Sequence, residues 1–85
     1  MTHRDPDQSR AQIFLVERYW PGVDEARLQA ELPKLDAAAR RMTAEGVAVE
    51  HVGTILMPVD QVVFTLIAAT SEADVRELNE RVHMA

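Results

Sequence analysis

The sequence contains no cysteine, and its apolar runs are short. Without cysteine the chain can form neither a disulfide nor a thiolate metal site. No run approaches the roughly 20 apolar residues that a membrane-spanning helix needs, and residues 1–10 lack the apolar stretch of a signal peptide. We therefore expect a cytoplasmic protein with no membrane partner.

Basic residues are also scarce, since 9 lysines and arginines stand against 14 aspartates and glutamates. The resulting net charge is −5, and the basic residues are scattered along the chain instead of clustered. Binding to nucleic acid depends on a basic surface that contacts phosphates. We therefore expect no nucleic-acid partner.

The chain is short, with 85 residues. A domain of this size buries only about 60% of the surface that its unfolded chain exposes. Such domains are usually stabilised by disulfides, by a metal or by a partner subunit. Because cysteine is absent, a partner subunit or a metal held by histidine and carboxylate ligands remains.

The polar residues 1–10 show no hydrophobic period, so we expect a mobile N-terminal arm followed by one domain over residues 11–85. Three segments in that domain are rich in β-branched and apolar residues and are bounded by turn residues. They predict strands at residues 11–19, 47–57 and 61–69.

Two helices are predicted between and after these strands. Asp24 suits the cap of the first helix, and Gly46 suits its left-handed end. Pro33 interrupts the apolar period of this helix and predicts a kink or a break. Ser71 with Asp74 three residues later resembles a capping box, which predicts the start of the second helix.

The order of strand, helix, two strands and helix is that of a ferredoxin-like α+β domain, with an antiparallel sheet and both helices on one face. A complete domain of this kind has a fourth strand after the second helix. Residues 83–85 are too few for a strand of about five residues. We therefore expect the fourth strand to be missing or supplied by a partner, beside the first strand.

Both faces of the predicted sheet are apolar. In the first strand Phe14 faces one side and Leu15 the other, and in the third strand Val63 and Phe64 divide in the same way. A sheet with helices on one face and water on the other should instead alternate apolar and polar residues. Because a large exposed apolar patch marks an interface, we expect a homodimer or higher homo-oligomer that packs sheet to sheet.

The segment from Phe14 to Tyr19, FLVERY, runs directly into Trp20-Pro21-Gly22. Together with Glu45-Gly46 and the segment 69–73, ATSEA, it resembles a family of small bacterial proteins, some known as nickel-binding and most of unknown function. The resemblance implies a ferredoxin-like fold, dimerisation and nickel binding, and it carries over Glu17 as a matching charged position.

Glu17 and His51 are polar residues within apolar strands. Counting alternate residues places Glu17 with Tyr19 and His51 with Ile55. If both sets share the face away from the helices, the carboxylate and the imidazole could together bind Ni(II) or another divalent transition metal, or perform acid–base chemistry. The alternative is that Glu17 pairs with a cation such as Arg18 and that His51 is a solvated edge residue.

A second hypothesis is a dimeric α+β barrel that binds or transforms a small apolar ligand. Its cavity would be lined by Tyr19, Trp20 and Thr65, with His51 beside them. The alternative is that Tyr19 and Trp20 only cap the core over the first helix. The sequence has no glycine-rich phosphate loop and no nucleophile elbow, so no class of enzyme is indicated.

A third hypothesis is a non-enzymatic interaction module whose open strand edge accepts a strand from another protein. It rests on the expected absence of a fourth strand beside the first.

Overall fold

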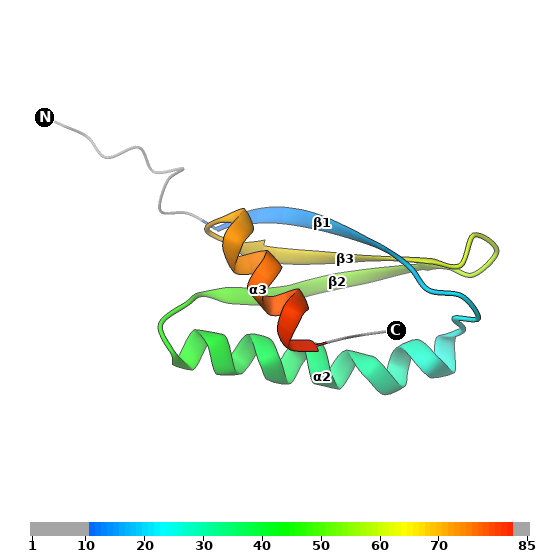
Figure 1. Ribbon diagram of the computed structural model, residues 1–85, viewed down its shortest axis with the longest axis horizontal. Helices are drawn as coiled ribbons and strands as arrows, with labels where there is room; N and C mark the ends of the chain where they lie inside the picture. The colour runs from blue at the N-terminus through cyan, green and yellow to red at the C-terminus, as the bar shows by residue number, and fades with distance from the viewer. Residues whose placement is uncertain (1–10, 83–85) are drawn as a thin grey trace, which may run out of the picture.

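The computed structural model describes residues 11–82, and the expected arm over residues 1–10 lies outside them. Three strands and two helices follow one another in the predicted β-α-β-β-α order (Figure 1). Their bounds are Gln12–Tyr19 for β1, Glu25–Ala44 for α2, Val49–Met57 for β2, Val62–Ala69 for β3 and Glu72–Val82 for α3. The predicted α+β class and the predicted element order are therefore confirmed.

The three strands form one antiparallel sheet in the order β1-β3-β2. Figure 1 shows α2 and α3 on the same side of this sheet, with no element over its other side among the described residues. Because β3 is central, β1 and β2 are the two edges of the described sheet. The fold therefore has one helix-covered face and one open face.

The core lies between the helices and the covered face of the sheet. Alternate residues of β3 point into it, and all four are buried: Val63, Thr65, Ile67 and Ala69. The helices meet them with side chains that are at most 2% exposed, namely Leu35, Met42 and Leu78. Alternation in one central strand and a helical stripe above it thus account for a one-sided core.

Both ends of α2 follow the predicted signals. The Asp24 carboxylate accepts a hydrogen bond of 2.8 Å from the backbone N–H of Arg27, as expected for a helix cap. Val23 and Leu28 flank this cap and are both buried, so they fix the direction in which the chain enters the helix. Gly46 follows the last turn with φ of +100°, a left-handed conformation that favours glycine.

Of the predicted kink or break at Pro33, the break is wrong, because α2 runs without interruption through this residue. An interior proline costs about 3 kcal/mol in a helix. Leu28 and Leu35 lie on either side of it and are almost completely buried, and each such side chain contributes about 1.5–3 kcal/mol. Pro33 itself is exposed, so packing on the opposite side of α2 holds the helix together.

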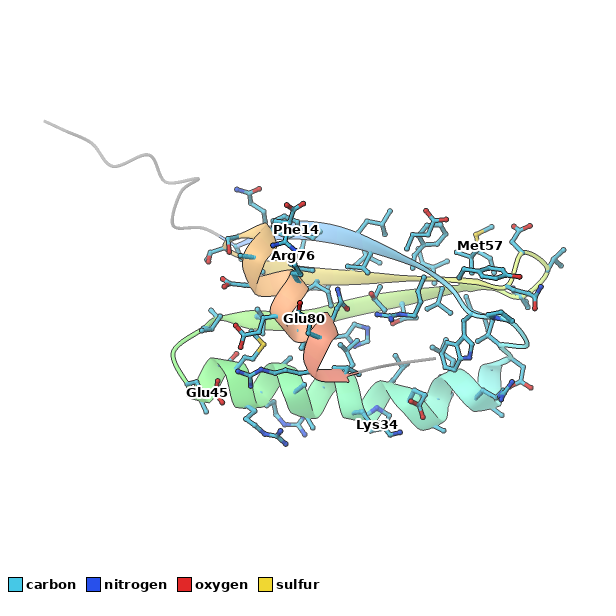
Figure 2. The ribbon with its side chains drawn as sticks, in the orientation of Figure 1. Phe14, Lys34, Glu45, Met57, Arg76 and Glu80 are labelled. Atoms are coloured by element: carbon cyan, nitrogen blue, oxygen red, sulfur yellow. The ribbon has the colours of Figure 1, made fainter. Side chains whose placement is uncertain are left out.

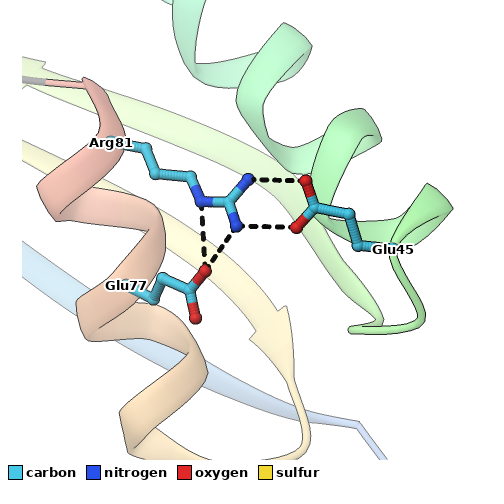
Figure 3. Close-up of polar contacts among 3 residues, drawn as sticks. All are labelled: Glu45, Glu77 and Arg81. Carbon is cyan, nitrogen blue, oxygen red and sulfur yellow. Dashed lines mark hydrogen bonds and ion pairs between the residues drawn. The ribbon is translucent and has the colours of Figure 1, made fainter.

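The helix α3 begins at its predicted cap, where the backbone N–H of Asp74 donates to Ser71 Oγ at 3.2 Å. Its last turn is tied to the end of α2 by Arg81 (Figure 3). Two guanidinium nitrogens of Arg81 donate to the two carboxylate oxygens of Glu45 at 2.7 and 3.2 Å, and the same side chain bonds Glu77 one turn earlier. This bidentate contact joins the two helices at one end of the molecule.

A β-bulge interrupts β2. His51 pairs with Ile67 and Gly53 pairs with Leu66, so Val52 is an extra residue with no partner in β3. An extra residue shifts the alternation of a strand by one. The residues of β2 that face the helices are therefore odd-numbered before Val52 and even-numbered after it.

Candidate functional site

The uncovered side of the sheet is mostly apolar and is here called the open face. The strand registers assign to it Ile13, Leu15, Glu17 and Tyr19 of β1, Glu50, Gly53, Ile55 and Met57 of β2, and Val62, Phe64, Leu66 and Ala68 of β3. Figure 2 shows Met57 on the side of the sheet away from α2. The prediction that the sheet is apolar on both faces is thus confirmed.

The exposure of the open face is high for such side chains. Leu15 is 61% exposed, Tyr19 64%, Ile13 57% and Ile55 51%. Single exposed apolar residues are ordinary, but these lie on β1 and β2 on either side of the half-buried Phe64 and Leu66 of β3. Together they form a patch of the kind that marks an interaction site. The open face is therefore the first candidate functional surface.

The charge on the open face is entirely acidic among the described residues, since it carries Glu17 and Glu50 and no basic side chain. Glu17 forms no ion pair with any described residue. Arg18 lies on the opposite face, where its Nη2 donates to Asn79 Oδ1 of α3 at 3.1 Å and burial lowers its pKa. Alternation along β1 thus separates Glu17 from the adjacent cation.

The second candidate is a polar cluster between α2 and β2, here called the His51 cluster and made of Asp36, His51 and Thr54 with the Gly53 carbonyl. His51 Nδ1 lies 2.9 Å from Asp36 Oδ1, and Nε2 lies 2.5 Å from Thr54 Oγ1 and 3.0 Å from Gly53 O. The His51 side chain is only 10% exposed. Both ring nitrogens therefore have partners, on one side from the helix and on the other from the bulge.

The chemistry of these partners constrains the protons. A carboxylate can only accept, so Nδ1 of His51 carries a proton and donates it to Asp36. Nε2 then either accepts from the Thr54 hydroxyl, when the ring is neutral, or donates to Gly53 O and Thr54, when the ring is charged. The cluster can hold a proton at Thr54 Oγ1 or at His51 Nε2.

Two open hollows meet at His51. One has a volume of about 760 Å³ and lies along the second half of α2, where Ala39, Thr43 and Val49 contribute to its lining. The other, of about 490 Å³, lies along the first half of α2 and includes Thr54 in its lining. Space beside the His51 cluster is therefore large enough for a small molecule.

The structure does not bring Glu17 and His51 together. Glu17 lies on the open face, whereas His51 precedes the bulge and shares the helix-covered side with Val49. The prediction that His51 shares a face with Ile55 is wrong, because Val52 shifts the alternation between them. Among residues 11–82 no three histidine, aspartate or glutamate side chains lie close enough to hold a metal ion.

The three predicted ligand-lining residues are also in different environments. Tyr19 is exposed on the open face, Trp20 is 7% exposed within the core, and Thr65 is 2% exposed beneath the helices. Neither of the two hollows is lined by any of them. The interpretation of Trp20 as part of the core over α2 agrees with its burial.

Asp36 and Thr54 were not singled out from the sequence. Both are ordinary surface residue types at their positions, and they meet His51 only because α2 crosses β2 beside the bulge. The available signal was Gly53, two residues after His51, since an isolated glycine inside a strand often marks a bulge.

No family model, curated protein or solved structure matches the chain. Among the described residues no helix is sufficiently long and apolar to cross a membrane.

Proposed function

We propose that this chain is a homodimeric interaction module of the ferredoxin-like kind, in which the open faces of two copies pack against each other. The observation that supports this most is the concentration of exposed apolar side chains on one face of the sheet, among them Leu15 on the edge strand β1. Burial of apolar surface contributes roughly 25 cal/mol per Å². An apolar sheet face is commonly buried by packing against the face of a second sheet.

The chemistry of the open face favours a second copy as its occupant. A two-fold interface brings the same patch of each subunit together, so the patch must complement itself. An apolar surface does so, and the open face is apolar except for Glu17 and Glu50. These acidic residues and the net charge of −5 disfavour an anionic membrane surface or a nucleic acid.

The test is a charge placed on the open face. We expect the unchanged protein to sediment as a dimer at micromolar concentration, and Leu15→Glu to sediment as a monomer because the new carboxylate would have to be buried. The matched control is Ala30→Glu, which adds the same charge at an exposed position of α2. Circular dichroism of each variant checks that the fold is retained.

Two results would contradict the proposal. One is a monomer for the unchanged protein at micromolar concentration. The other is a Leu15→Glu variant that is folded and still dimeric, because that result would indicate pairing through the edge of β1 instead of packing through the open face.

Binding of Ni(II) or another divalent transition metal stays a separate prediction from the resemblance of the sequence. In the proposed dimer Glu17 would enter the interface, whereas His51 lies on the other side of the sheet in each copy. The positions of these residues therefore support self-association more directly than a joint metal site.

A further inference from the structure

We propose that the His51 cluster is an acyl-transfer site in which Thr54 is the nucleophile, His51 the general base and Asp36 a positioning residue. Its substrate class is esters of small apolar acids. This inference does not depend on dimerisation, because all three side chains come from one copy and none belongs to the open face.

The geometry carries the proposal. A hydroxyl becomes nucleophilic when a base lies within hydrogen-bond distance and a third group holds the base in place. Thr54 Oγ1 lies 2.5 Å from His51 Nε2, and Asp36 Oδ1 lies 2.9 Å from Nδ1 on the far side of the ring. The order of hydroxyl, imidazole and carboxylate is the one that such a site requires.

The cluster also accommodates the proton that the reaction moves. When Thr54 gives up its proton, both ring nitrogens of His51 carry one. Nδ1 then donates to Asp36, and Nε2 faces the Gly53 carbonyl at 3.0 Å, which can accept. The bulge therefore supplies an acceptor for the charged ring that forms during attack.

The surroundings of Thr54 indicate the acyl group. Half of the residues that line the hollow containing Thr54 are apolar, namely Leu28, Leu32, Leu56 and Pro58, and Glu25 and Gln29 also line it. A short hydrocarbon chain can pack against the four apolar side chains, whereas Glu25 would repel a negatively charged acyl group. Among the described residues β2 pairs only with β3, so outward N–H groups of this edge strand are available to stabilise an oxyanion.

The steps balance without a further reagent. Thr54 Oγ bonds to the carbonyl carbon while its proton passes to His51 Nε2, and the ester C–O bond breaks as that proton moves to the departing alkoxide. Water then attacks the acyl-threonine ester, His51 takes a proton from the water, and that proton returns to Thr54 Oγ as the acid leaves.

The test uses p-nitrophenyl butyrate and the full chain. We expect release of p-nitrophenolate and a butyryl group on Thr54, located by mass spectrometry of peptides after acid quenching. Thr54→Val should abolish this modification and lower the rate at least about tenfold, because proton transfer and nucleophilic attack are both lost. Thr54→Ser retains a hydroxyl and should retain the modification at position 54.

Further variants separate chemistry from structure. Thr70→Val makes the same change at an exposed threonine outside the cluster and should leave the modification of Thr54 unchanged. Asp36→Asn should slow acylation about tenfold or more, with partial rescue by Asp36→Glu, as a positioning residue requires. Thermal melts show whether each variant is folded.

The proposal is overturned if Thr54 carries no butyryl group in the unchanged protein. It is equally overturned if folded Thr54→Val reacts as fast as the unchanged protein. Either result would leave the cluster as a structural link between α2 and the bulge.

Discussion

Two glycines show how backbone conformation and available space act separately. A Cβ at Gly46 or at Gly53 would meet no atom within 4 Å, but only Gly46 has a positive φ, of +100°. We expect Gly46→Ala to destabilise the fold by about 1–2 kcal/mol, because an L side chain is strained in this region. A thermal melt should show a loss of about 4–8 °C per kcal/mol.

The matched variant is Gly53→Ala, which adds the same methyl group in a strand without the positive φ. We expect its melting temperature to be equal to or above that of the unchanged protein. Equal losses in the two variants would mean that the added methyl group, and not the backbone of Gly46, is responsible.

At the same scale, the sequence identified His51 as chemically unusual but not its partners. An imidazole within an apolar strand is visible in a single sequence. Its hydrogen bonds to Asp36 and Thr54 depend on the register of β2 and on the position of α2. Register is set by pairing with another strand and cannot be read from one strand alone. The sequence could therefore identify His51 as unusual but could not predict which side chains would contact it.

Among the elements, α3 and α2 share the core, and Arg81 adds a bidentate contact from α3 to Glu45 at the end of α2. The hydrogen bond from Arg81 holds the pKa of Glu45 below its usual value. A carboxylate with a lowered pKa in the folded state contributes stability above its unfolded pKa, and this contribution disappears as the pH falls through the folded pKa. Arg81→Gln should therefore lower the melting temperature by a few degrees at neutral pH and by less in acid.

The control for this element is Arg76→Gln, since within residues 11–82 Arg76 pairs only with Glu72 of the same helix, at 3.4 Å. Both substitutions remove one positive charge from α3. If the loss of melting temperature depended on pH as strongly in Arg76→Gln as in Arg81→Gln, the lost positive charge, and not the contact between the helices, would be responsible.

The elements themselves were predictable to within a few residues, and their interruptions were not. Asp24, Gly46 and Ser71 mark helix ends through local hydrogen bonds and backbone conformation, which depend on few neighbours. The continuity of α2 through Pro33 depends on packing against the sheet, and the bulge at Val52 depends on pairing with β3. Both are tertiary effects that override local preference.

For the whole molecule, dimerisation would couple stability to concentration. If only folded chains associate, mass action stabilises the folded state as protein concentration rises. We expect the melting temperature of the unchanged protein to increase between about 1 and 100 μM, in the range where sedimentation shows association. The Leu15→Glu variant should melt at a temperature independent of concentration, and a slope equal to that of the unchanged protein would contradict the role of the open face.

The open face was the part of the whole molecule that the sequence predicted best. Two apolar sets in the same strands, represented by Leu15 and Phe14, predict two apolar faces whatever the register. The helices cover only one of them. The placement of Glu17 on the remaining surface followed from alternation in β1, which has no bulge.

The strand order β1-β3-β2 also has a consequence for folding during synthesis on the ribosome. β1 is synthesised first, but its partner β3 is complete only after α2 and β2 have been made. The hairpin of β2 and β3 can form locally, whereas the pairing of β1 with β3 requires closure of a long loop. During that interval Ile13, Leu15 and the unpaired backbone of β1 are exposed to chaperones and to neighbouring nascent chains, so β1 needs protection until β3 is complete.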